Sequence, residues 1–325
     1  GLYHLERSLK GQLITGPEQA AVLDSAIHHF KAAIALDPGW SAPHPRISTA
    51  YRLRTLHLTE DTAAEYDRRA KAEALRGIEL DETDAEAHAS LASVLLGREQ
   101  DWAGAERAIR RSLELDPYAR ALTAAAFMTA AGRHDEAIPL WRKAEARYPL
   151  SEQLKSWAVM AYACAGLHDE AIARARQLTD RMTRSGRTGV PGDSTWLLTF
   201  LAYEHSMKGE HAEAIAAAEG LVARGAEPES RVALAFVYAR AGRRDEARVL
   251  TERLEGEASS RGGPWRPAQL YAALGDTQRA LDMVEATTKE RRPEVNFRCG
   301  ITYRVLAHEP RMRELIRSFG FPSSD

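Results

Sequence analysis

The sequence predicts an all-α fold, a right-handed superhelical solenoid of about eight helical hairpins closed by a C-terminal capping helix. Three observations predict it. A short motif that begins with glycine and ends with alanine recurs along the chain, successive copies lie 34, 43, 33 and 33 positions apart, and a proline closes several units in the N-terminal half. Such a period indicates a supersecondary unit that buries its apolar faces only by stacking on its neighbours.

Two series of residues set the register of the repeat. In its fullest form the motif reads Gly-x-His-Asp-Glu-Ala-Ile, and its alanines are Ala137, Ala171, Ala214, Ala247 and, in a weaker copy, Ala280. A second series follows an alanine by 11 positions, at Asp37, Asp81, Asp116 and Tyr148 after Ala26, Ala70, Ala105 and Ala137. Both series share one register, which divides a single solenoid over 1–325 into repeats 1–40, 41–83, 84–117, 118–150, 151–194, 195–228, 229–262 and 263–293, with a cap at 294–325.

Each unit is predicted to be two helices joined by a tight turn. The first helix has apolar residues at helical spacing, and the motif glycine, which can adopt the left-handed conformation, follows its end. Asp-Glu then opens the second helix, because the positive N-terminus of a helix favours acidic side chains. Small residues are expected where two helices approach closely, at the eight alanines named above and seven positions after four of them, at Ala33, Gly77, Ser112 and Ala144.

This pattern resembles tetratricopeptide repeats over essentially the whole chain. The ending, Tyr303 to Pro322, is similar to the short closing helix of bacterial tetratricopeptide regions attached to a signalling domain. In those relatives the repeats follow a winged-helix, adenylate-cyclase or protein-kinase module. The resemblance implies that this chain is the sensor or docking half of such a regulator, with an output domain upstream. The stretch near 57–62 and the insertion at 184–194 depart from the pattern.

Composition and charge exclude several classes of protein. A net charge of −2 and a pI near 6.7 provide no global field for nucleic acid or an anionic membrane, so we expect neither partner. Cys164 and Cys299 lie 135 positions apart without a CxxC pair, so we expect no disulfide framework, no structural zinc and a reducing compartment. Because nothing in the given sequence directs export, we expect the cytoplasm. The apolar stretches fall short of the roughly 18 residues that span a bilayer. Because the chain begins at Gly1, we expect a piece of a longer protein, in which an upstream transmembrane helix would instead place it outside the cell.

The search for catalytic and metal-binding motifs favours a protein without an enzymatic activity or a cofactor. The sequence contains no GxSxG, GxxxxGK[ST] or HExxH motif. His28 and His29 are adjacent on a predicted helix, where side chains point about 100° apart and do not share a metal ion. His134, His168 and His211 recur two residues after the turn glycine, and we interpret them as turn residues of the repeat.

The insertion at 181–195 is a candidate binding loop. It contains three glycines, one proline and three arginines and falls at a helix junction, where solenoids carry binding loops. Arg184, Arg187 and Asp193 are its candidate contacts to a phosphate or carboxylate. The alternative is a tolerated surface insertion.

The concave groove, lined by the first helix of each unit, is the favoured binding surface. Counting back from each alanine gives a lining that is small and apolar with isolated arginines, without the Lys and Asn that tetratricopeptide co-chaperones use to clamp a C-terminal carboxylate. We expect it to suit a protein or peptide segment with apolar anchors, with an arginine engaging an acidic group. The candidate groove residues are Val94, Arg98, Leu122, Met160, Tyr203, Met207, Phe236, Arg240, Trp265 and Gln269.

Three functions remain open at this point. The leading hypothesis is a non-catalytic interaction scaffold or regulatory module that binds a peptide or partner domain in this groove. The alternative is a small-ligand sensor that controls an attached output domain through superhelical pitch. An enzyme using Asp193 and Ser194 ranks last, because the sequence offers no base near the Ser194 hydroxyl. If Phe236 faces the groove, Phe236→Glu should weaken partner binding and leave helicity nearly unchanged.

Overall fold

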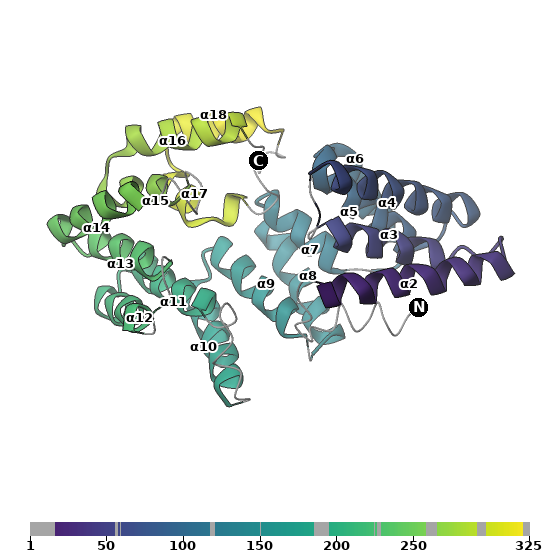
Figure 1. Cartoon of the computed structure of the whole chain (residues 1–325), viewed down its shortest axis with the longest axis horizontal. Coiled ribbons are helices and arrows are strands. Elements are labelled where there is room, and N and C mark those ends of the chain that lie inside the picture. The colour runs from purple at the N-terminus through teal and green to yellow at the C-terminus, as the bar shows by residue number, and fades with distance from the viewer. Residues whose placement is uncertain are drawn as a thin grey trace. The chain divides into compact units, whose positions relative to one another are not determined.

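The structure, a computed structural model, describes residues 17–55, 58, 60–117, 121–149, 151–184, 195–223, 225, 229–257, 265–290 and 297–320. These residues form helices that follow one another as antiparallel pairs (Figure 1). They divide into two compact units, one up to Leu154 and one from Lys155 onward, each treated by itself below. The division of the chain into a single solenoid over 1–325 stays a prediction.

The described residues of unit 1 form one helix followed by three helical hairpins. The apolar residues of the first helix and of the hairpin that follows it form one buried cluster around Leu23, Ile47 and Tyr51. The helices are α2 (Pro17–Leu36), α3 (Pro43–Arg54) with α4 (Glu60–Leu80), α5 (Ala85–Val94) and its π-helical continuation (Leu95–Glu99) with α6 (Trp102–Leu115), and α7 (Ala121–Ala130) with α8 (His134–Arg147).

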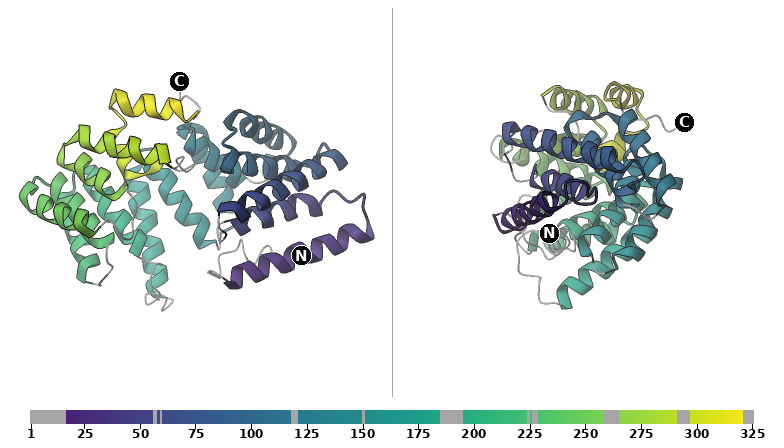
Figure 2. Two further views of the ribbon diagram at one scale, coloured as in Figure 1. Left: turned by 45° about the horizontal axis from the view of Figure 1, so that its top comes forward. Right: turned by 90° about the vertical axis from the view of Figure 1, so that its right-hand side faces the viewer.

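In unit 2 the described residues form four hairpins and a closing pair of short helices, which Figure 2 shows in teal, green and yellow. The unit boundary falls inside its first helix. The hairpins are α9 (Glu152–Cys164) with α10 (His168–Arg184), α11 (Thr195–Lys208) with α12 (His211–Ala223), α13 (Glu229–Arg240) with α14 (Arg244–Glu257), and α15 (Trp265–Leu274) with α16 (Thr277–Glu290). A 3₁₀ turn (Phe297–Cys299), α17 (Ile301–Leu306) and α18 (Pro310–Ser318) follow.

The predicted repeat register is confirmed in both units. All eight alanines that define it are at most 1% exposed, because each lies where two helices meet. Gly77, predicted as a small contact position, approaches α5 so closely that a Cβ there would lie 3.2 Å from the Cβ of Ala87. Ser112, from the same series, is buried and donates to the carbonyl of Ala85 at 2.7 Å.

The turn glycines also adopt the predicted conformation. Gly132, Gly166, Gly209, Gly242 and Gly275 have φ between +73° and +84°. At each turn the glycine N–H and the following N–H donate back to carbonyls three and five residues earlier, as in a Schellman motif. The predicted turn histidines His134, His168 and His211 are the first residues of α8, α10 and α12.

The C-terminal cap is a pair of helices rather than one. In unit 2 the first helices α11, α13 and α15 contact one another in a row, and α17 extends that row by packing on α15. The second member, α18, packs on α16 and begins at Pro310, whose missing N–H costs nothing at the first position of a helix. The cap therefore consists of two short helices, one packed on each helix of the preceding hairpin.

Candidate functional site

An apolar cluster of unit 2, called here the inner cluster, joins the first helices α11, α13 and α15 with the second helices α12 and α14. Its core includes Ala202 on α11, Phe236 on α13 and Leu270 on α15, and Tyr203 packs against it. The Tyr203 and Phe236 rings meet edge to face with their centroids 4.9 Å apart. The Nε2 amide of Gln269 donates to the hydroxyl of Tyr203 at 2.8 Å, so α11 and α15 are joined directly across α13.

Three residues predicted for the groove are thus brought together, but one of them is not accessible. Phe236 is fully buried within the inner cluster, whereas Tyr203 and Gln269 are half-buried. The expectation that Phe236 presents its ring to solvent is therefore corrected. Consecutive first helices of unit 2 lie in contact. Phe236, which the repeat register assigns to the groove, therefore packs against the neighbouring first helix instead.

The first helices α11, α13 and α15 are called here the inner row, and another segment of the same chain covers part of it. Ile301 and Val305 of α17 pack against the inner cluster, while Leu306 is buried in a second cluster with Tyr271 and Met312. Ile301 and Val305 are four positions apart, so they lie on one face of the helix. The inner row of unit 2 therefore already holds a short amphipathic helix.

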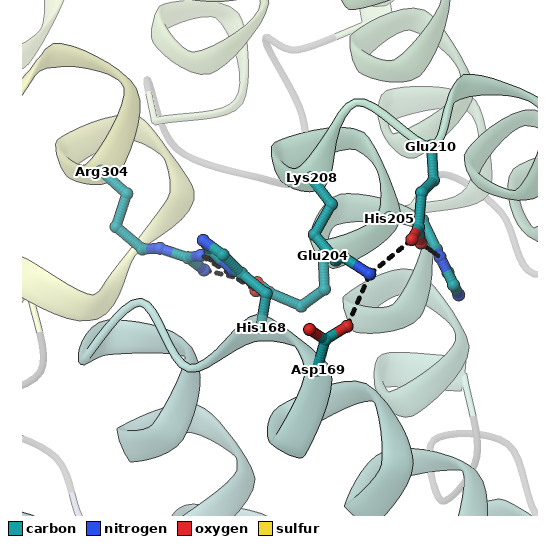
Figure 3. Close-up of polar contacts among 7 residues, drawn as sticks. All are labelled: His168, Asp169, Glu204, His205, Lys208, Glu210 and Arg304. Carbon is teal, nitrogen blue, oxygen red and sulfur yellow. Dashed lines mark hydrogen bonds and ion pairs between the residues drawn. The ribbon is translucent and has the colours of Figure 1, made fainter.

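A buried carboxylate fixes the polar side of α17. Glu204 on α11 has no exposed surface, and Arg304 of α17 donates to both of its oxygens, with Nη2 3.0 Å from Oε2 (Figure 3). Nδ1 of His168, the first residue of α10, lies 2.7 Å from Glu204 Oε2. A buried carboxylate without a partner is strongly unfavourable, so Glu204 requires the cation that α17 supplies.

A disulfide forms a second, covalent connection. Cys164 at the end of α9 is bonded to Cys299, and the two Cα atoms lie 5.0 Å apart. One glycine separates Cys299 from the first residue of α17. This corrects the expectation of two unpaired cysteines. The reason is topological, because residues 135 positions apart in the sequence become neighbours when α17 folds back along the inner row. The argument from cysteine usage for a reducing compartment is removed with it.

A second polar cluster joins α10, α11 and α12 and lines an open cavity of about 310 Å³. Lys208 donates to Asp169 at 2.6 Å and also to Glu210 (Figure 3). Nδ1 of His205 lies 2.6 Å from Glu210 Oε2, and Arg176 donates to Nε2 at 3.0 Å, which places the imidazole proton on Nδ1. Hydrogen bonds from Lys208 and His205 lower the pKa of Glu210, and the two carboxylates raise the pKa of Lys208. The cluster ties neighbouring hairpins together.

Arg240, another predicted groove residue, has an unusual environment. It ends α13, is half-buried, and its Nε is buried without a hydrogen-bond partner among the described residues. Burial lowers the pKa of its guanidinium. A partly desolvated guanidinium whose Nε has no partner in the described part of the chain is a favourable contact for an anionic group.

The other predicted site residues are scattered. Val94 is buried in the unit 1 cluster, and Leu122, Met160 and Met207 are half-buried. Arg184 is exposed at the end of α10 and donates to the carbonyl of Asp180. Four predicted residues lie outside what the structure describes, Arg98 and Trp265 in their side chains and Arg187 and Asp193 entirely.

Sequence reasoning missed Glu204, Arg304 and the disulfide. A charged residue on an apolar first helix, as Glu204 is, was the one available signal, because burial of such a residue requires a counter-charge. In the described part of the chain, His, Cys, Asp and Glu form no group of three or more that could hold a metal ion. No helix in that part is sufficiently long and apolar to span a bilayer.

Comparison with known proteins finds likenesses among solved structures alone. No protein-family model matches the sequence, and no curated protein matches it. Among solved structures the chain is similar to yeast Tom70, with 11% identity and a TM-score of 0.45 over 96% of this chain and 67% of that one. It is also similar to the TPR domain of P58(IPK), with 16% identity and a TM-score of 0.24 over 95% of this chain and 99% of that one.

Proposed function

We propose that this chain is a non-catalytic interaction module that binds a segment of a partner protein along the inner row of first helices. The observation that carries the proposal is α17, a six-residue helix seated on that row. Two apolar side chains one turn apart, with a charged residue beside them, are the features by which an amphipathic helix is recognised in a groove. A surface that holds such a helix from its own chain has the shape and chemistry for one from a partner.

The proposed partner carries apolar anchors and an acidic group. Tyr203, Met160 and Met207 are half-buried residues predicted to line the groove, and aromatic and methionine side chains are frequent at adaptable interfaces. Arg240 supplies the contact for the acidic group, because forming a charge-assisted hydrogen bond would satisfy its buried Nε. By the resemblance of its ending, the chain would serve as the docking half of a larger regulator.

A charge-reversal pair tests this proposal. Purified full chain, an Arg240→Glu variant and an Arg244→Glu variant would be used to capture proteins from lysate and identify them by mass spectrometry. Arg244 is a matched control, because it is an exposed arginine at the start of the outer helix α14, four positions away. Partners retained by Arg244→Glu and lost from Arg240→Glu would support the inner row as the binding surface. Equal capture by both variants would contradict the role of Arg240.

A further inference from the structure

The short helix α17 is held in place by three different kinds of interaction. Ile301 and Val305 pack on the inner cluster, Arg304 pairs with the buried Glu204, and Cys299 anchors the start of the helix to α9 through the disulfide. A helix of six residues is too short to persist alone in water. The helical conformation of α17 therefore depends on its packing against the inner row, and any change that weakens this packing also unfolds the helix.

Of these interactions only the disulfide is a covalent bond, which reduction breaks and oxidation forms again. Cys299 is buried, whereas Cys164 is partly exposed at the end of α9, so a thiolate from solution reaches the Cys164 sulfur first. The sequence contains no other cysteine, so reduction has no competing exchange partner within the chain. The more exposed residue, Cys164, thus lies on α9, which stays in place, and the buried Cys299 belongs to the segment with α17, which would move.

We propose that the Cys164–Cys299 disulfide is a redox latch that keeps α17 on the inner row of unit 2 and thereby blocks the surface assigned above to a partner. The inference rests on the proposed function, because it regulates that same surface. In the oxidised chain α17 stays on the inner row and the surface is blocked. Reduction frees Cys299 and leaves only noncovalent contacts, which are the ion pair of Arg304 and the packing of Ile301, Val305 and Leu306. The helix α17 then exchanges with a partner helix.

The reductant required is a dithiol. One of its thiolates attacks the Cys164 sulfur, breaks the bond to Cys299 and releases that sulfur as a thiolate, leaving a mixed disulfide on Cys164. The second thiolate of the dithiol attacks its own bound sulfur, which releases Cys164 and closes the reductant into a cyclic disulfide. The two protons of the dithiol pass to the two cysteines. Two electrons move from the dithiol to the protein disulfide.

Hydrogen exchange followed by mass spectrometry tests the latch on the full chain with and without dithiothreitol. We expect the amides of 301–306 to exchange at least about tenfold faster after reduction, while those of α13 keep their protection. A Cys164→Ser/Cys299→Ser variant should show the fast exchange in both conditions. Unchanged exchange of 301–306 would overturn the latch. Equal acceleration in α13 would also overturn it, because the disulfide would then stabilise the whole unit.

A labelled peptide with the sequence of residues 300–309 separates the latch from the proposed function. Reduced full chain should bind it measurably by fluorescence polarisation and oxidised chain at least about tenfold more weakly. Fast exchange of 301–306 without peptide binding would retain the release of α17 but overturn the claim that release opens a binding surface. Equal binding to both forms would overturn the latch and leave the proposed surface intact.

Discussion

The two units are built from the same hairpin but differ in the range of their side-chain connections. In unit 1, ion pairs between successive hairpins join residues about one repeat apart, at Arg54 and Asp24, Lys71 and Glu99, and Arg133 and Glu106. Unit 2 has such neighbour pairs as well, for example Lys208 and Asp169. It adds connections across 66, 100 and 135 positions, at Gln269 and Tyr203, Arg304 and Glu204, and Cys164 and Cys299.

This difference determines how each unit should respond to damage. A stack joined only through neighbours loses stability locally, one interface at a time, whereas connections that return to an earlier hairpin couple distant interfaces. Unit 2 should therefore unfold more cooperatively, and changes at its long-range connections should affect helices far from the altered residue.

The largest effect is expected from Phe236→Glu. A carboxylate placed where Phe236 is fully buried loses the ring's contacts with Tyr203 and buries an unpaired charge, which should cost at least about 4 kcal/mol of unfolding free energy. Circular dichroism during urea unfolding should show a large loss of stability in unit 2. Val249→Glu, at a half-exposed valine of α14, is the matched control and should be nearly neutral. Intact stability in Phe236→Glu would show that the ring faces solvent, as the sequence alone predicted.

Glu204→Gln should have the next largest effect. It leaves Arg304 beside a neutral amide in a buried setting and should cost about 3 kcal/mol. In unit 1, Glu73→Gln removes the carboxylate 2.7 Å from His44 within a single hairpin and, being partly exposed, should cost about 1 kcal/mol. Hydrogen exchange should show that Glu204→Gln loosens 301–306 as well as α11, while Glu73→Gln loosens only α3 and α4. Purely local effects in both variants would remove the contrast between the units.

Removing the disulfide should have an intermediate effect on unit 2. The Cys164→Ser/Cys299→Ser variant should lose about 2–4 kcal/mol of unfolding free energy relative to oxidised chain, because the disulfide closes a long loop of the unfolded chain. The variant and the reduced wild type should unfold at the same urea concentration, and dithiothreitol should leave the variant unchanged. A variant as stable as the oxidised chain would show that α17 is held by packing and Arg304 alone.

The repeat in the sequence predicted the fold well because its signals are local. The turn glycines, the acidic residues after them and the buried alanines each act within one hairpin or between neighbours, and the sequence displays them at a regular period. The positive φ of Gly132 and Gly242 and the burial of Ala70 and Ala247 follow from that period without reference to distant residues.

The candidate site was harder to predict because its decisive contacts are long-range. Nothing local to Glu204 identifies Arg304 as its partner, and the spacing of Cys164 and Cys299 carries no pairing signal. Both pairings arise only when the first helices of unit 2 and α17 are brought together in three dimensions. The same closure explains why Phe236, at a groove position by register, is buried instead.

The smallest predicted effect concerns pH and the surface cluster at Glu210. Hydrogen bonds from Lys208 and His205 hold the pKa of Glu210 below its usual 4.5, so its contribution to stability is present above that pH and is lost as the pH falls through the lowered value. The melting temperature of the wild type should therefore exceed that of Glu210→Gln at pH 7, and the gap should close toward pH 3. Glu213→Gln, which removes another carboxylate from the same cavity, is the matched control. A gap that is equal at both pH values would mean that the ionised form of Glu210 does not stabilise the junction of α10, α11 and α12, and that the neighbour connections of unit 2 contribute less than its long-range ones.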